Sequence, residues 1–245
     1  MLVTAPGAQS GPAEYTVDSV SLGGNRTDPL LARVKSEMGG AVDAVDRFWG
    51  TDWQRRIVVV ATDSDAQFAA EAHLDPNRQW TDIAAVAVAD QVDPVRGTAS
   101  GQRIVMAPGA AAMSDEALRI VLTHELFHFA ARARTAVDAP WWFTEGVADF
   151  VARRPEPLPA GAAADTALPG DTDLNTPGAQ RSAGYDRAWW FARFVAAEFG
   201  VDGLRRLYQQ ACGPGHGGFA DAVQRALGVD AGVLQTRWAQ WLARR

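Results

Sequence analysis

The stretch His124-Glu125-Leu126-Phe127-His128 lies inside a segment, residues 114–134, that the sequence predicts to be one helix. Ser114 stands where a helix N-cap belongs, and Asp115 and Glu116 place negative charge in the first turn, where the helix dipole favours it. Residues four positions apart lie on the same face of a helix, so both imidazoles can reach a single metal ion. The pattern therefore predicts a metal site on this helix.

Glu125 is offset from the histidines by about 100° around the helix axis, so its carboxylate is expected beside the ion and not on it. Zinc lowers the pKa of a bound water from about 15.7 to roughly 7, and a carboxylate in that place can take the proton. The alternative is that two histidines fell at this spacing by chance on a buried helix. With four histidines in the chain, that accident is expected in about one sequence in a few hundred.

Two histidines are too few, because catalytic zinc normally takes three protein ligands. The extended pattern HExxHxxGxxH would put a third histidine at position 134, but the chain has Ala131 and Arg134 there. His73 and His216 lie far away without a motif, and we expect each to be a surface or capping residue. A carboxylate further along the chain must then complete the site.

A second predicted helix follows Pro140 and offers Glu145 and Asp149 on one face. Glu145 has tryptophan and phenylalanine before it and valine and alanine after it, and a glutamate in such apolar company needs a partner. We expect Glu145 to be the third metal ligand and Asp149 to accept the other ring N–H of His124. Gly146 would let two helices approach closely. The alternative for the two acids is a solvated acidic face.

Upstream of the motif the sequence predicts one long helix and a small sheet. Apolar residues recur at helical spacing over Asp28–Trp49, and Gly50 follows as a stop. Three short apolar runs, Arg56–Ala61, residues 83–89 and Arg103–Met106, are typical of strands. Turn residues between the last two runs favour a hairpin-like connection.

Downstream, prolines end the second helix near Arg153, and residues 154–184 have little periodicity. So long a connector is either a functional loop over the cleft or an inert excursion. The remainder is predicted to form four helices over residues 185–199, 202–211, 218–227 and 230–245. We expect the four tryptophans at positions 141, 142, 189 and 190 to belong to the core and not to a substrate subsite.

Composition narrows the possible partners. The net charge of −6 and the pI of about 5.2 argue against nucleic acid, and no apolar run reaches the roughly 18 residues of a membrane span. The single cysteine, Cys212, cannot form an internal disulfide and is expected to be an inert buried thiol. We expect residues 1–15 to be a flexible tether and residues 16–245 a single domain, with a sheet lobe over 16–110 and a helical lobe over 111–245. An upstream signal or anchor would make the protein extracytoplasmic or membrane-tethered. The oligomeric state is not indicated.

The motif at 124–128, the segment Pro140-Trp141-Trp142-Phe143-Thr144-Glu145-Gly146-Val147-Ala148-Asp149-Phe150 and Tyr185 together resemble the gluzincin clan of zinc metallopeptidases. The chain is most similar to the small bacterial peptidase MA-like proteins. The resemblance implies an α+β, zincin-like fold, in which an edge strand of a small N-terminal sheet lies beside the HExxH helix and a mostly helical lobe follows.

The resemblance also implies a role for each matching residue. It gives zinc ligands at His124, His128 and Glu145, a general base at Glu125 and an orienting carboxylate at Asp149. It implies that Arg103–Met106 is the sheet edge along which an extended substrate adds as another strand. Clan members use a downstream Tyr or His to hydrogen-bond the oxyanion; Tyr185 resembles that residue, although a packing role is an equal alternative and Arg187 is a weaker candidate.

Two features depart from the large families of the clan. Sixteen residues, 129–144, separate His128 from Glu145, which requires a tighter loop between the helices. The exopeptidase signature of the aminopeptidases is missing, because the segment before the motif reads Gly101-Gln102-Arg103-Ile104-Val105-Met106-Ala107-Pro108. The expected function is therefore a zinc metallopeptidase, more an endopeptidase than an exopeptidase, acting on a peptide or protein. A non-catalytic zinc-binding module, against which Glu125 argues, and an amidase acting on a non-protein amide are the alternatives.

Overall fold

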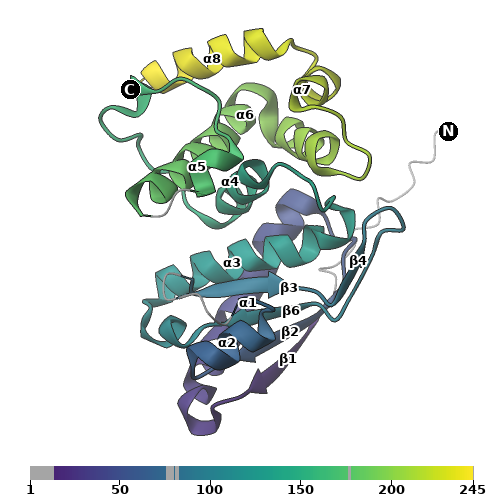
Figure 1. The fold of residues 1–245 in the computed structure, drawn as a ribbon, viewed down its shortest axis with the longest axis vertical. Helices are drawn as coiled ribbons and strands as arrows, with labels where there is room; N and C mark the ends of the chain where they lie inside the picture. The colour runs from purple at the N-terminus through teal and green to yellow at the C-terminus, as the bar shows by residue number, and fades with distance from the viewer. Residues whose placement is uncertain (1–13, 76–79, 81–82, 176–177, 245) are drawn as a thin grey trace, which may run out of the picture.

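The computed structural model describes residues 14–75, 80, 83–175 and 178–244, and the expected tether at 1–15 falls almost wholly outside them. The fold is α+β, with an N-terminal mixed four-stranded sheet followed by a mostly helical C-terminal region (Figure 1). The sheet has the order β1-β2-β6-β3, and a separate two-stranded ribbon pairs β4 with β5. These strands are β1 Thr16–Ser21, β2 Arg56–Ala61, β3 Ala85–Val88, β4 Gln91–Asp93, β5 Thr98–Ser100 and β6 Arg103–Met106.

Strand β3 is the sheet edge beside the motif helix, so the expectation that Arg103–Met106 forms this edge was wrong. Strand β6 lies between β2, to which it is parallel, and β3, to which it is antiparallel. Ile104, Val105 and Met106 are all fully buried, whereas burial alternates along β3. A continuous apolar run is typical of a central strand, and this signal was present in the sequence. The expected hairpin-like connection is confirmed, since β3 and β6 pair as antiparallel neighbours.

Helices cover both faces of the sheet. Helix α1, Asp28–Trp49, has the predicted bounds and packs its apolar stripe on the face that also carries Ile57 and Ile104. The short helix α2, Asp65–Glu71, covers the opposite face, where Phe68 packs against Val60 and Val105. Both α2 and β1 were missed by the sequence analysis, because each offers too few buried apolar side chains to show a period.

The motif helix α3, Asp115–Ala131, begins at its predicted cap, since the Ser114 hydroxyl accepts a hydrogen bond from the Ala117 N–H. A short 3-10 turn, η3 Arg132–Arg134, extends it, and helix α4, Trp141–Ala152, follows. Pro140 gives α4 no side-chain cap. Instead, Asp171 accepts a hydrogen bond of 2.8 Å from the Trp142 backbone N–H.

Residues 154–184 are not one structureless loop. They contain the 3-10 turn η4 Ala162–Ala164, the helix α5 Asp171–Asn175 and the first residues of α6, Ala179–Cys212. Helix α6 thus begins six residues before the predicted start at 185. Most side chains in its first turns are exposed, so no apolar stripe marks them.

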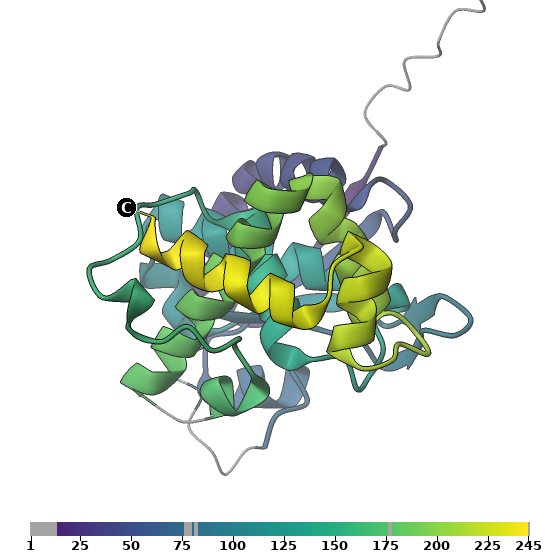
Figure 2. The same ribbon diagram turned by 90° about the horizontal axis from the view of Figure 1, so that it is seen from above.

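Helix α6 bends at Gly200, whose φ of 77° and ψ of 162° are not helical, and this bend separates the two helices predicted over 185–199 and 202–211. Helices α7, Phe219–Leu227, and α8, Ala231–Ala243, match the last two predictions closely. Seen from above, α8 lies across the outer side of the helical region (Figure 2), where Trp238 contacts Phe191 and Phe194 of α6. One apolar cluster extends from the core-facing side of the sheet through α3 and α4 to α8.

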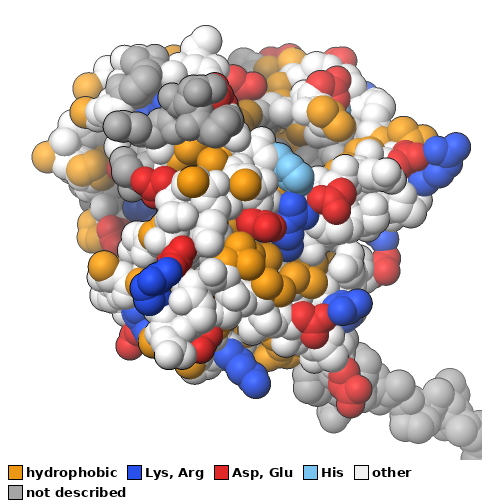
Figure 3. All heavy atoms as spheres, turned by 60° about the horizontal axis from the view of Figure 1, so that its bottom comes forward, with side chains coloured by type: hydrophobic (Ala, Val, Ile, Leu, Met, Phe, Trp, Pro, Cys, Tyr) orange, Lys and Arg blue, Asp and Glu red, His pale blue; other side chains and the backbone are white. Residues whose placement is uncertain are grey.

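Two further 3-10 turns precede helices. Turn η1, Gly24–Arg26, comes before α1, and turn η2, Pro108–Ala112, comes before α3. Acidic and basic side chains are interspersed on the face of the molecule shown in Figure 3, without a continuous basic surface. Among the described residues, no helix combines the length and hydropathy that a membrane span requires.

Candidate metal centre

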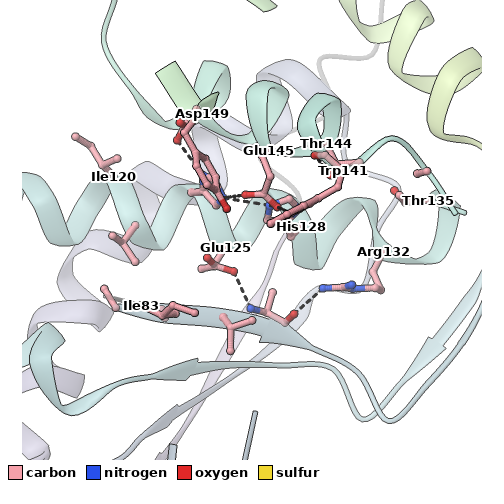
Figure 4. Close-up of a pocket in the computed structure, with 18 of the residues that line it drawn as sticks. Ile83, Ile120, Glu125, His128, Arg132, Thr135, Trp141, Thr144, Glu145 and Asp149 are labelled. Atoms are coloured by element: carbon pink, nitrogen blue, oxygen red, sulfur yellow. Dashed lines mark hydrogen bonds and ion pairs between the residues drawn. The ribbon is translucent and has the colours of Figure 1, made fainter. Parts of the chain in front are cut away.

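Helices α3 and α4 bring three ligand atoms to one point (Figure 4). His124 and His128 lie one turn apart on α3, and their ring centroids are 4.8 Å apart. The Nε2 atoms of the two histidines are separated by 3.1 Å. Glu145 on α4 places Oε2 3.1 Å from His124 Nε2 and Oε1 3.4 Å from His128 Nε2. These three residues could hold a metal ion.

The spacing of the donor atoms fits a small tetrahedral ion. Ligand atoms at the usual zinc distances of about 2.0–2.1 Å, arranged tetrahedrally, lie about 3.3 Å from one another. The separation of 3.1 Å between the two Nε2 atoms is close to this value, and Glu145 approaches His124 through Oε2 and His128 through Oε1. Two imidazole nitrogens and one carboxylate also suit a borderline-soft divalent cation better than calcium or magnesium, which prefer oxygen donors.

Asp149 supports His124 from behind, as the sequence predicted. Its Oδ1 lies 3.0 Å from His124 Nδ1, so the imidazole is held through one ring nitrogen while the other faces the ligand cluster. Such a contact fixes the tautomer of a ligating histidine and raises its basicity. The other carboxylate oxygen of Asp149 is 3.4 Å from Arg153 Nη1, which also pairs with Asp186.

Trp141 packs against the core, as expected, but it also contacts a candidate ligand, which the sequence analysis did not anticipate. Its indole N–H donates to Glu145 Oε1 over 3.1 Å, and its half-buried ring lines the cavity. Trp142 and Trp189, by contrast, are buried core residues as expected, and Trp190 packs against the same core. The sequence does not predict this bond, because the direction of the indole N–H depends on the side-chain rotamer.

Glu125 points away from the three ligands and toward strand β3 (Figure 4). Its Oε2 accepts a hydrogen bond of 2.7 Å from the Ala87 backbone N–H. Burial raises the pKa of the Glu125 carboxyl, and the nearby histidines offset this only in part. A raised pKa is the direction that a carboxylate needs to act as a base near neutral pH.

The carboxylates around the two histidines favour a positive charge at this site. Burial alone would lower the pKa of His124, but its bonds to Asp149 and Glu145 outweigh this and raise the pKa well above the usual range. Burial would raise the pKa of Glu145, but the charges and hydrogen bonds of His128 and His124 lower it strongly. A site that holds protonated imidazole this firmly is also suited to a divalent cation.

Tyr185 lies in the same cavity, with its ring 6.4 Å from that of Trp141 in an edge-on arrangement. Burial, together with the charges of Glu145 and Asp149, raises the pKa of its hydroxyl, which stays protonated at neutral pH. Arg187, the weaker candidate, pairs with Asp165 and donates to the Ala167 carbonyl. It is not among the residues that line the cavity.

The cavity has a volume of about 990 Å³, and its walls come from β3, α3, the segment between α3 and α4, α4 and α6. Its polar lining includes Arg132, Thr135 and Tyr208, which the sequence analysis did not name as site residues. Arg132 follows His128 by four residues, and that spacing could have placed it on the same face. Tyr208 is distant in sequence, and only packing brings it to Thr135, whose hydroxyl lies 3.0 Å from its own.

The other two histidines lie outside the ligand group. His73 Nε2 is 2.8 Å from an Arg103 nitrogen at the surface, and His216 Nδ1 is 3.0 Å from the Gly217 carbonyl. Both therefore have the local roles that we expected.

No protein-family model matches this chain, and no curated protein matches it either.

Proposed function

We propose that this protein is a zinc-dependent metallopeptidase with a zincin-like fold of the gluzincin type. The observation that carries the proposal is the grouping of His124, His128 and Glu145 as candidate ligands, with the half-buried carboxylate of Glu125 lining the same cavity. A binding site alone needs the three ligands but has no need of a fourth, unligated acid next to them. Hydrolysis needs that acid as a base.

The three ligands leave one side of a tetrahedral ion free, as catalytic zinc sites do. When bound, zinc would supply Lewis-acid activation of a water molecule and polarisation of the scissile carbonyl. Asp149 and Trp141 would keep the histidine and the glutamate in their ligating orientations through the bonds described above.

Glu125 carries out both proton transfers, and Tyr185 stabilises the oxyanion between them. Glu125 takes a proton from the attacking water, whose oxygen forms a bond to the scissile carbon. The Tyr185 hydroxyl donates a hydrogen bond to the oxyanion that develops there. Glu125 then passes the proton to the amine nitrogen as the C–N bond breaks, which gives a carboxylic acid and an amine.

The surroundings of the site favour a polypeptide substrate. Strand β3 is a sheet edge within the cavity wall, and an extended chain can pair with such an edge at Ala85, since the outward groups of Ala87 bond to Glu125 and Arg132. Among the described residues that line the cavity, the carboxylates are Glu125, Glu145 and Asp149, and each has a task at the proposed metal centre. None of these described acids is left to bind a free amino terminus, so we expect an endopeptidase.

The test is a comparison of Glu125→Gln and Glu145→Gln with Glu116→Gln, a control at an exposed position in the first turn of α3. We expect the wild type to bind one zinc ion per chain and to cleave an unfolded protein, and a chelator to abolish cleavage. Glu125→Gln should keep the zinc and lose about 10²- to 10⁴-fold in kcat, whereas Glu145→Gln should lose the zinc. Glu116→Gln should behave as the wild type.

Two outcomes would count against the proposal. A wild type that binds zinc but cleaves no unfolded protein would be a binding module, or an amidase if it hydrolyses non-protein amides. A Glu125→Gln variant that cleaves at the wild-type rate would remove this residue from the chemistry.

A further inference from the structure

Both backbone polar groups of Ala87 bond to side chains of the motif helix and its extension, Glu125 and Arg132 (Figure 4). The Ala87 N–H donates to Glu125 Oε2 over 2.7 Å. The Ala87 carbonyl accepts a hydrogen bond of 2.6 Å from Arg132 Nη2. Ala87 therefore links Arg132, in η3, to the carboxylate that the proposed function makes the general base.

These two bonds lie on the free edge of β3. The Ala84 carbonyl accepts from the Ala107 N–H, so position 84 and every second residue after it face β6 in the ladder. The N–H and carbonyl of Ala87 consequently point outward, toward α3. An edge strand of four residues has no ladder on that side, and the bonds to Glu125 and Arg132 fix its position against the helix.

Arg132 has no other evident task. Of the described residues that line the cavity, Arg132 alone is a lysine or arginine, and its Nε atom is buried without a hydrogen-bond partner among them. A buried donor left without a partner costs stability, so contacts elsewhere in the side chain must account for this placement. The bond to Ala87 is the one that the structure provides.

We infer that Arg132 is a positioning residue for Glu125. By holding the Ala87 carbonyl, Arg132 orients that residue so that its N–H fixes one oxygen of the Glu125 carboxylate and leaves the other oxygen to receive the proton. The inference rests on the proposed function for its catalytic consequence, but the contact itself can be tested without any activity.

The experiment compares Arg132→Met and Arg132→Lys with Arg134→Met. Arg134 lies in the same 3-10 turn, pairs with Asp52 and does not line the cavity, so it is a matched control. Arg132→Met keeps the aliphatic stem and removes the donor, while Arg132→Lys restores one donor that can reach a carbonyl. Folding of each variant is checked by thermal unfolding and zinc content.

The first measurement is amide hydrogen exchange, resolved by residue and made without substrate. In Arg132→Met we expect exchange at Ala87 to rise roughly tenfold or more, and exchange at Val86, which faces β6 in the ladder, to stay slow. Arg132→Lys should recover part of the protection, and Arg134→Met should match the wild type. Unchanged exchange at Ala87 in Arg132→Met would overturn the inference whether or not the protein is a peptidase.

The second measurement separates kcat from KM on an unfolded protein substrate. We expect Arg132→Met to lose about 10- to 100-fold in kcat with the zinc content and KM retained. Arg132→Lys should recover part of this loss. A rise in KM alone would mean that Arg132 binds substrate and does not position the base, and would overturn the inference. If the wild type cleaves nothing, the proposed function fails, and the exchange result still decides whether Arg132 holds Ala87.

Discussion

His124 is the residue on which most of the site depends, because each of its ring nitrogens has a carboxylate partner. Nε2 faces Glu145 and His128, and Nδ1 faces Asp149. Asp149 is itself buried, with 8% of its surface exposed, so its negative charge is poorly screened by water. The charge of Asp149 therefore acts directly on the basicity of the ligand.

Replacing Asp149 by Asn tests this arrangement. The amide can still accept a hydrogen bond from the imidazole, but it carries no charge. We expect Asp149→Asn to weaken zinc binding by about 10- to 100-fold, measured by competition with a chromogenic chelator. Asp186→Asn is the control, since Asp186 shares Arg153 with Asp149 and has no contact with His124. Equal zinc affinity in the two variants would show that the charge of Asp149 has no part in metal binding.

Cys212 is a second residue whose behaviour follows from its surroundings. Its side chain is fully buried at the end of α6, and burial raises the pKa of the thiol. The thiolate is the reactive form, so we expect no reaction of the native protein with a thiol reagent over minutes, and one thiol per chain after denaturation. Rapid modification of the native protein would contradict the burial of this residue.

Helix α4 lies between α3, which carries the two histidines, and α6. It contributes Glu145 to the candidate ligand group. Gly146 makes the contact with α6 possible, because a Cβ at this position would overlap the Ala188 carbonyl oxygen and carbon. Gly146 follows Glu145 directly, so the residue that lets α4 pack on α6 is next in sequence to the candidate third ligand.

Gly146→Ala should therefore act on both stability and metal binding. Overpacking against backbone atoms typically costs about 1–3 kcal/mol, and a shift of α4 would move Glu145 away from the histidines. We expect a lower denaturation midpoint and weaker zinc binding in the same variant. Gly40→Ala is the control, because this glycine of α1 is exposed, meets nothing within 4 Å and should gain up to about 1 kcal/mol of helix propensity. Equal stability of the two variants would contradict the close approach of α4 and α6.

In the molecule as a whole, the candidate metal centre lies between the sheet-bearing half and the helical half. Helix α3 packs against α1 and β3, while α4 packs against α6, and the ligand group spans the two. An ion that binds the folded chain and not the unfolded one stabilises the fold by about 2.7 kcal/mol at a hundredfold excess over Kd. For a chain of this size, that corresponds to a rise in Tm of about 5 to 10 °C.

We expect this rise when zinc is added to chelator-treated protein, measured by thermal unfolding with and without zinc. His128→Asn removes one ligand and should show little or no rise. A wild type whose Tm does not respond to zinc would argue that the three residues hold no ion under these conditions.

Features that depend on neighbours along one helix could be predicted from the order of the amino acids. The i, i+4 spacing of His124 and His128, the Ser114 cap and the pairing of Glu145 with Asp149 were all readable, because helical geometry converts a fixed spacing into a fixed direction. The bounds of α1 followed for the same reason, from a long apolar stripe with a clear stop.

Contacts between residues of different elements became known from the folded chain alone. It made β3 and not β6 the edge beside α3, placed Asp171 at the start of α4, turned the Trp141 indole toward Glu145 and brought Arg132 to the Ala87 carbonyl. None of these contacts has a constant spacing in the chain. Each contact forms because packing brings distant segments of the chain together, and local periodicity does not predict which segments meet.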